Sequence, residues 1–295
     1  MEEKMREAQP EDKTKVLITG AGGQLGLELQ RVFREKGYEV YGMDRDSLDI
    51  TDAEQCHTML NRVHPDVVIH AAAYTQVDQA ESDSDTAYRV NAYGTRNIAA
   101  AAEAAGAKLV YVSTDYVFNG KGTMPYSEFH PTDPVNVYGR SKWEGEELVR
   151  QLHTRFFVVR TSWVYGAGGS NFVRTMLKVG KRDGRVSVVA DQIGCPTYTK
   201  DLAFAIEQLS STQRYGTYHV SGAGSCSWYE FACAIFEDAG MRVDVVPVNT
   251  EEYPRPAPRP AYSVLDHQAL RLNGFHPIRH WREALQDFLR SSHET

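Results

Sequence analysis

Tyr138 and Lys142 are the residues whose types and spacing most directly indicate chemistry in this sequence. On a helix, residues four positions apart lie on one face, so a phenol and an ammonium group can act together. A free tyrosine has a pKa of about 10, and a nearby cation lowers that pKa by stabilising the phenolate. Such a phenol can donate a proton to a carbonyl oxygen. A surface Tyr–Lys pair without function is the competing interpretation.

A hydroxyl group is expected beside this pair. The apolar run 109–113 predicts a buried strand, and Thr114 and Asp115 follow it directly. Ligands of open α/β sheets bind at the carboxyl ends of the strands, where these residues would lie. The helix that carries Tyr138 precedes the next predicted strand and would lie next to that edge. The order of these features favours a catalytic group over a chance pair.

A glycine-rich turn near the start of the chain predicts a dinucleotide site. Gly20, Gly23 and Gly26 follow the apolar run 15–19 and open a segment with apolar residues at helical spacing. Glycine at these positions permits a tight turn, close approach to a pyrophosphate and close helix–strand packing. The anion then binds the free amides at the helix N-terminus. A glycine-rich loop without a ligand is the alternative.

The choice between NAD and NADP stays open. Asp44 ends the second predicted strand, where a carboxylate can accept hydrogen bonds from the adenosine ribose and favours NAD. Arg45 follows it and could pair with the additional phosphate of NADP. A solvated turn explains the same residues without any ligand.

The elements that must position these groups alternate along the chain. Short β-type runs at 15–19, 39–43, 67–70, 109–113 and 156–160 are separated by helical patterns, including a capping box of Thr51 and Glu54 and a helix over 135–153. Strands buried on both faces require crossover connections. We therefore predict an α/β fold, a Rossmann-type doubly wound parallel sheet with a smaller α/β substrate-binding portion on the C-terminal side.

The predicted boundaries divide the chain into three parts. Residues 1–14 are polar and charged and predict a disordered extension. Residues 15–163 form the dinucleotide-binding domain. Residues 164–295 form mainly the substrate-binding portion, with some segments that return to the first domain.

Composition excludes several classes of partner. The formal net charge is −7 and no basic stripe occurs, so nucleic acid is not an expected partner. The four cysteines form no CxxC pair and have no metal-ligand spacing with histidine, which predicts reduced thiols and no metal site. No apolar run approaches the ~20 residues of a membrane span. We expect a cytoplasmic protein without a membrane partner.

Together the motifs resemble the extended short-chain dehydrogenase/reductase superfamily, and within it the dTDP-4-dehydrorhamnose reductase family. The similarity covers about residues 15–290. It is carried by segments 23–26, 65–73, 77–81, 113–118, 136–139, 160–165, 171–172, 191–192 and 194–197.

The resemblance implies reduction of the 4-keto group of dTDP-4-dehydro-β-L-rhamnose by NADPH or NADH, in nucleotide-sugar biosynthesis for cell-surface polysaccharide. Tyr138 would donate the proton, Thr114 would bond the reacting oxygen, and Lys142 would hold the nicotinamide ribose and tune Tyr138. The cofactor would contact Gly20, Gly23, Gln24, Leu25, Gly26, Asp44, Arg45, Asp49, Ile50, Ala71, Ala72, Ala73, Thr75, Asn91, Tyr138 and Lys142. The substrate would contact Thr114, Asp115, Trp163, Asn171 and Arg259, with core packing as the alternative role of Trp163.

Two positions distinguish this sequence from its relatives. Dehydratases of the superfamily carry a glutamate after the Thr-Asp pair, whereas this chain has Tyr116, which argues against dehydration. Some family members bind Mg²⁺ at a dimer interface through glutamates. Glu28 fits one such position, but Lys200 stands where an acid is needed, and a cation there opposes a divalent metal. We therefore expect no Mg²⁺ and a monomer or weak homodimer.

Two other functions remain open. One is an epimerase or a reductase of another nucleotide sugar on the same scaffold. The other is a regulatory subunit that binds dinucleotide without turnover.

Overall fold

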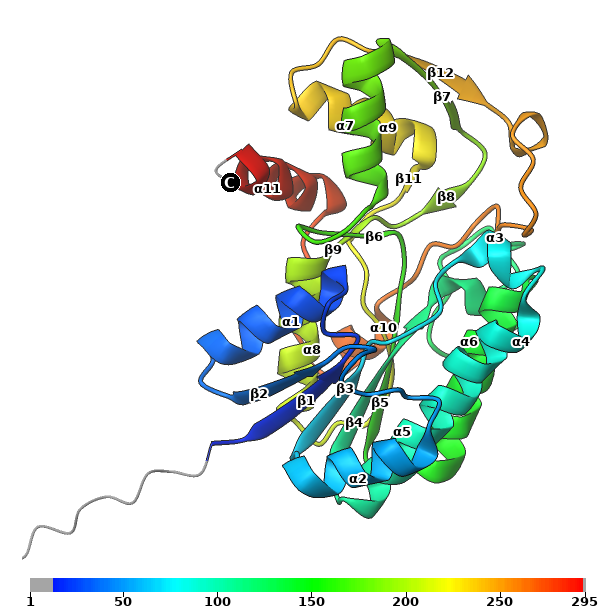
Figure 1. The fold of residues 1–295 in the computed structure, drawn as a ribbon. Helices are drawn as coiled ribbons and strands as arrows, with labels where there is room; N and C mark the ends of the chain where they lie inside the picture. Colours follow the sequence, from blue (N-terminus) through cyan, green and yellow to red (C-terminus); the bar gives the residue numbers. More distant parts are fainter. Residues whose placement is uncertain (1–12, 294–295) are drawn as a thin grey trace, which may run out of the picture.

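The computed structural model describes residues 13–293 and has a six-stranded parallel sheet at its centre (Figure 1). The strand order is β10-β5-β4-β3-β1-β2, so the direction of winding changes between β1 and β3. Ligand sites of such sheets lie at this switch point, outside the carboxyl ends of the strands. The strands are β1 (Lys15–Thr19), β2 (Glu39–Met43), β3 (Val67–His70), β4 (Lys108–Thr114), β5 (Phe156–Thr161) and β10 (Gly216–His219). The predicted doubly wound fold is confirmed.

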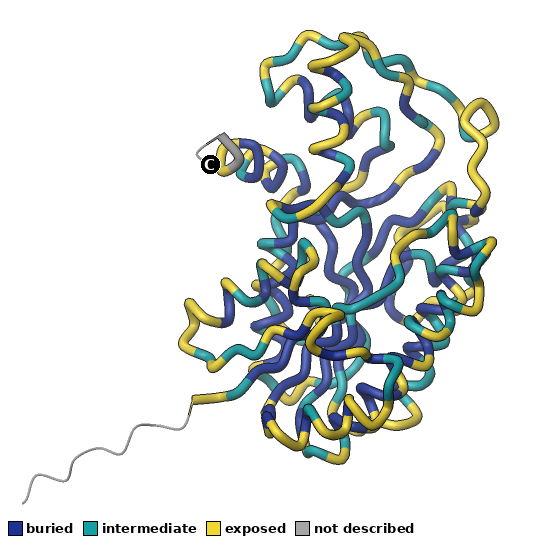
Figure 2. The backbone as a smooth tube through the Cα atoms, viewed as in Figure 1, coloured by how far each residue is buried: buried dark blue, intermediate teal, exposed yellow. Residues whose placement is uncertain are grey.

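Helices cover both faces of this sheet. On one face lie α1 (Gln24–Glu35) and α8 (Thr199–Ser210), and on the other α2 (Ala53–Val63), α5 (Thr95–Ala104) and α6 (Val137–Leu152) (Figure 1). Side chains alternate between the faces along each strand. In β1, Val16 and Ile18 join the core beneath α1, whereas Leu17 joins the core beneath α2 and α5. The inner strands β1, β3, β4 and β5 are buried along most of their length for this reason, whereas the edge strand β2 is partly exposed (Figure 2).

A smaller part lies over the carboxyl edge of the sheet and has its own core (Figure 1). It contains α7 (Phe172–Asp183), α9 (Trp228–Asp238), α11 (Trp281–His293) and the parallel pair β7 (Arg185–Val189) and β12 (Asp244–Val248). The two-residue strands β6 (Val164–Tyr165), β8 (Ile193–Gly194), β9 (Thr197–Tyr198) and β11 (Cys226–Ser227) pair where this part meets the sheet.

Short helical turns complete the connections. They are α3 (Val77–Ala80), α4 (Ser84–Tyr88), the π-helical turn η1 (Arg89–Gly94), the 3-10 turns η2 (Asp115–Val117) and η3 (Thr250–Glu252), and α10 (Gln268–Leu272). No helix within residues 13–293 is long and apolar enough to cross a membrane.

Two local expectations are corrected by the structure. The sequence predicts five strands for the central sheet, whereas the structure has a sixth, β10. This four-residue edge strand pairs with β5, and no local sequence pattern indicates that pairing. The predicted capping box of Thr51 and Glu54 is wrong, because Asp52 caps α2 and accepts from the amides of Glu54 and Gln55. The Thr51 hydroxyl instead donates to Asp49.

The predicted division into parts stays a prediction. Both β10 and α8 come from the C-terminal half of the sequence, yet they pack with the sheet and helices of the N-terminal half. Of the predicted disordered extension, residues 1–12 lie outside the described residues.

We predict that Asp52→Ala lowers the free energy of unfolding by about 1 kcal/mol, since it removes the acceptor for two amides at the start of α2. Urea denaturation measures the change. The matched control is Glu54→Gln, which costs less because Glu54 is exposed and does not supply the cap. A larger loss in Thr51→Ala than in Asp52→Ala would restore the Thr51 capping box.

Candidate active site

A cavity of ≈ 1080 Å³ lies along the carboxyl edge of the central sheet. The turn after β1, the loops after β2, β3, β4 and β5, and helix α6 all contribute to its wall. Eighteen of the predicted site residues line it, namely Gly20, Gly23, Gln24, Leu25, Gly26, Asp44, Arg45, Asp49, Ile50, Ala71, Ala72, Ala73, Thr75, Thr114, Asp115, Tyr138, Lys142 and Trp163. Residues from 20 to 163 in the sequence therefore meet in one site.

The glycine-rich turn has the shape that a pyrophosphate requires. Gly20 has a φ of +69°, and a Cβ there would lie 2.8 Å from the Ala72 amide nitrogen. A Cβ at Gly26 would overlap the Gly20 carbonyl oxygen. Gly23 caps α1 without any side-chain hydrogen bond, so the first amides of that helix remain available to an anion. The residues present therefore fit a dinucleotide.

Asp44 and Arg45 directly follow β2 at the cavity wall, and both are exposed. Asp44 Oδ1 accepts from the Ser47 hydroxyl at 2.9 Å and from the amides of Ser47 and Asp46 at 3.1 Å. These hydrogen bonds, chiefly those of Ser47, lower the pKa of Asp44. The Asp44 carboxylate is therefore held in place through Oδ1 by its own turn.

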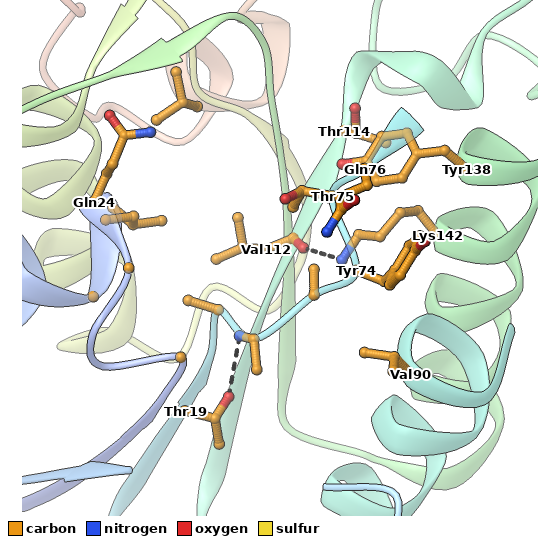
Figure 3. A pocket seen from close by; sticks show the side chains of 18 of the residues that line it. Thr19, Gln24, Tyr74, Thr75, Gln76, Val90, Val112, Thr114, Tyr138 and Lys142 are labelled. Atoms are coloured by element: carbon orange, nitrogen blue, oxygen red, sulfur yellow. Dashed lines mark hydrogen bonds between the residues drawn. The ribbon is translucent and has the colours of Figure 1, made fainter. Parts of the chain in front are cut away.

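Thr114, Tyr138 and Lys142 lie together on one side of the cavity, and Gln24 lies opposite them (Figure 3). Thr114 ends β4, whereas Tyr138 and Lys142 occupy the first turns of α6. That helix is fixed by Asn136, whose side chain accepts from the Gly139 amide at 2.7 Å. The three predicted catalytic side chains are thus brought together by the end of a strand and the start of a helix.

The Lys142 ammonium is directed at the sheet (Figure 3). Its Nζ donates to the Val112 carbonyl oxygen at 2.7 Å and lies 4.1 Å from the centroid of the Tyr111 ring. Lys142 is 2% exposed. Burial lowers the pKa of Lys142 to about 7, although the charge of Glu146 raises it.

The pKa of Tyr138 differs from the sequence expectation. Burial raises the pKa of Tyr138 to about 12, and a hydrogen bond with Thr114 only partly offsets this. The sequence analysis expects Lys142 to lower that pKa. In the structure the net shift is upward, because the desolvated phenol resists ionisation and the Lys142 ammonium bonds the Val112 carbonyl instead.

Asp115 is a buried carboxylate beside Thr114. The Thr114 hydroxyl donates to Asp115 Oδ1 at 3.0 Å and accepts from the Tyr116 amide at 3.2 Å. Asp115 Oδ2 is buried and has no hydrogen-bond partner among the described residues. Burial raises the pKa of Asp115 to about 6. An unpartnered buried oxygen on a cavity wall suits a polar ligand.

Trp163 forms an aromatic wall of the cavity with a residue that the sequence analysis missed. Its ring stacks on Trp228 at 3.5 Å between centroids, and both rings line the cavity. Trp163 has a φ of +47°, which is rare for a bulky residue and is typical of functional sites. Trp228 lies within the α9 capping box of Ser227 and Glu230, but its distance of 65 positions from Trp163 leaves no signal in the sequence.

Three predicted site residues do not line the cavity. Asn91 is buried behind it, where its side chain bonds both backbone groups of Tyr74 and the Ser141 hydroxyl. Asn171 caps α7 and donates to Gln24 Oε1 at 2.9 Å. Arg259 pairs with Asp78, at 2.8 Å for the shortest contact. Each is held by protein groups in this structure, so direct ligand contact by these residues stays a prediction.

The positions considered for Mg²⁺ are occupied by ion pairs. Glu28 pairs with Arg31, and Lys200 Nζ lies 3.2 Å from Asp287. Among residues 13–293 no group of three His, Cys, Asp or Glu side chains is arranged to hold a metal ion. The expectation that Mg²⁺ does not bind remains a prediction.

Residues 14–294 match the family model described as the RmlD substrate binding domain. The chain belongs to this family. A Bacillus subtilis relative in the comparison, the spore coat polysaccharide biosynthesis protein SpsK, is 52% identical over 94% of this chain and 97% of its own length. The dTDP-4-dehydrorhamnose reductase of Mycolicibacterium smegmatis is 44% identical over 92% of this chain and 84% of that protein.

A solved structure of an RmlD-type protein has the same fold. The dTDP-4-dehydrorhamnose reductase of Bacillus anthracis, in complex with NADP, superposes with a TM-score of 0.94. It is 51% identical, and the match covers 95% of this chain and 100% of that one.

We predict that Gly26→Ala destabilises the protein by about 1–3 kcal/mol, because its Cβ would overlap the Gly20 carbonyl oxygen and crowd Ala21. Gly22→Ala is the matched control, since a Cβ there meets no heavy atom within 4 Å. Thermal unfolding without ligand measures both. Equal melting temperatures for the two variants would contradict the close packing of the turn.

Proposed function

We propose that this protein reduces the 4-keto group of dTDP-4-dehydro-β-L-rhamnose to give dTDP-L-rhamnose, using NADPH or NADH. One observation carries the proposal. Thr114, Tyr138 and Lys142 converge on one wall of a cavity whose other end is the glycine-rich turn of α1. The similarity to reductases of this name at 44% and 51% identity supports the choice of substrate.

A nicotinamide dinucleotide bound in this cavity would supply hydride to the carbonyl carbon. The residues of the chain supply the rest. Tyr138 keeps its proton at neutral pH, because its pKa is about 12, and so is ready to donate to the oxygen as negative charge develops there. Thr114 lies with Tyr138 on the same side of the cavity and would lie beside the site of reaction (Figure 3).

The Lys142 ammonium would act on the phenolate that forms. Its charge would stabilise the ionised phenol after proton transfer. Lys142 would also donate to the nicotinamide ribose, in exchange for its bond to the Val112 carbonyl. Both roles require the protonated amine.

The substrate would lie between these groups and the aromatic wall. We propose that Asp115 Oδ2 accepts from a sugar hydroxyl, since it has no partner among the described residues. Trp163 would cover one face of the hexose. Arg259 and Asn171 remain candidates for the diphosphate side, and Arg259 would have to exchange or share Asp78. Tyr116, in place of a glutamate, leaves no acid for dehydration at that position.

A cytoplasmic location, a monomer or weak homodimer, and the absence of nucleic-acid or membrane partners stay predictions of the sequence. The nucleotide sugar is the one partner that the site geometry itself supports, through a large cavity with polar groups such as Thr114, Asp115 and Tyr138 at its catalytic end.

We predict that Tyr138→Phe lowers kcat at least ~10²-fold, because the variant lacks the proton donor. Its affinity for NADPH should change less than about threefold, since only one hydroxyl group is removed from the site. NADPH oxidation and fluorescence titration measure the two quantities. The assay should include several nucleotide 4-keto sugars and an epimerase substrate.

Unchanged turnover in Tyr138→Phe would contradict the mechanism. NADPH binding without turnover of any sugar by the wild-type protein would favour the regulatory subunit. Faster turnover of a sugar other than dTDP-4-dehydro-β-L-rhamnose would keep the mechanism and change the substrate.

We predict that the enzyme prefers NADPH to NADH and that Arg45→Ala removes the preference. Arg45 is exposed at the cavity wall, whereas the neighbouring Asp44 carboxylate is engaged by its own turn. The KM for NADPH should rise about tenfold, and the KM for NADH should stay within about twofold. Arg62→Ala, a substitution of an exposed arginine on α2, is the control. Equal effects on both cofactors would assign the additional phosphate to another group.

A further inference from the structure

Glu146 is a fully buried carboxylate beneath the candidate active site. It lies on α6 one helical turn after Lys142, and its side chain is 0% exposed. It does not line the cavity. Burial alone would raise the pKa of Glu146, but the charge and hydrogen bonds of Arg160, helped by Arg150 and Ser113, lower it to about 2. Glu146 is therefore ionised throughout the neutral range.

Four hydrogen bonds tie this carboxylate to two strands and to its own helix. Arg160 of β5 donates from Nε at 2.9 Å and from Nη2 at 2.7 Å. Ser113 of β4 donates from Oγ at 2.6 Å. Arg150 of α6 donates from Nη2 at 2.9 Å. The contacts join α6, which carries Tyr138 and Lys142, to the residue that immediately precedes Thr114.

The register of the sheet explains why one side chain can do this. Ser113 and Arg160 lie opposite each other in the β4–β5 pair, and Thr114 lies opposite Thr161. A carboxylate that binds both Ser113 and Arg160 thus fixes the two strand ends relative to α6. The distance between the Thr114 hydroxyl and the Tyr138 phenol depends on that spacing.

Glu146 also determines the electrostatic surroundings of Lys142. Around Lys142, β3 contributes His70, which burial keeps neutral by lowering its pKa to about 3, and β4 contributes Tyr111, whose pKa burial raises. The same cavity is lined by Tyr138, Asp115 and Arg89, and Glu146 itself is bound by Arg150 and Arg160. Among these groups, Glu146 is the acid whose charge raises the pKa of Lys142 against burial.

We propose that Glu146 is a positioning residue for the reduction: it fixes Ser113 and Arg160 beneath the site, and its charge favours the ammonium form of Lys142. The proposal rests on the proposed function for its kinetic consequence. The effect on Lys142 itself requires no turnover, because a charged amine is also needed to hold the nicotinamide ribose. A role in folding alone would leave the pH dependence of both processes unchanged.

The test compares Glu146→Gln with Glu147→Gln, in full-length protein with NADPH as the probe. Glu147 directly follows Glu146 in the sequence, but its side chain is 36% exposed. It pairs only with Arg150 among the described residues. In Glu146→Gln, the loss of affinity for NADPH on the alkaline side should begin about one pH unit lower, because an uncompensated buried amine loses its proton earlier. The kcat for the keto sugar should fall at least tenfold at pH 8, whereas the KM should change less than about threefold. The alkaline limb of the pH profile of kcat should shift by the same amount as that of the NADPH affinity.

Two further variants keep the test decisive if Glu146→Gln does not fold. Glu146→Asp retains the charge and should keep the wild-type alkaline limb while kcat falls. Ser113→Ala removes the anchor beside Thr114 without changing any charge, and it should lower kcat about threefold to tenfold with no shift of the limb. Glu147→Gln should match the wild type in every measurement.

An unshifted NADPH profile in Glu146→Gln overturns the electrostatic role. Where Glu146→Gln does not fold, a shifted limb in Glu146→Asp overturns that role. Wild-type kcat in Ser113→Ala overturns the anchoring role. If the wild-type protein reduces no nucleotide keto sugar, the proposed function fails, yet the NADPH profiles still decide the role of Glu146.

Discussion

The buried ammonium of Lys142 is the interaction on which the rest of the site depends. Its Nζ bonds the Val112 carbonyl oxygen at the carboxyl end of the sheet and faces the Tyr111 ring. A buried amine tends to lose its proton, and the fold opposes that loss with the Glu146 carboxylate. That carboxylate in turn requires two arginines and a serine, so the network extends from α6 across β4 and β5.

This arrangement changes the usual account of a Tyr–Lys pair. Without a ligand, the phenol of Tyr138 is a weaker acid than free tyrosine, because burial outweighs the hydrogen bond with Thr114. A phenol that keeps its proton suits a reductase, which must donate that proton when the carbonyl oxygen becomes negative. In the proposed mechanism the lysine would then act on the product of proton transfer, and its charge would matter most after the phenol has ionised.

The sequence predicts the parts of the site that depend on local patterns. Gly20, Gly23 and Gly26 follow a strand and open a helix, and Tyr138 and Lys142 are one helical turn apart, so spacing alone relates them. Trp228 and Glu146 were missed for different reasons. Trp228 reaches the cavity only because α9 packs over the sheet edge, and Glu146 resembles an ordinary helix glutamate until β5 places Arg160 against it. The edge strand β10 likewise depends on a tertiary contact, its pairing with β5. The choice of Asp52 over Thr51 as the cap of α2 depends on the backbone conformation at the start of the helix.

The state of Lys142 is the central claim, and a titration of its side chain by heteronuclear NMR tests it most directly. Lysine labelled with nitrogen-15 and a Lys142→Met variant for assignment would identify the resonance. The account predicts a midpoint near pH 7 in the protein without ligand, with a higher midpoint once NADP⁺ is bound. A midpoint near 10.4 in the ligand-free protein, as for an ordinary lysine, would show that the amine is solvated and would contradict the account.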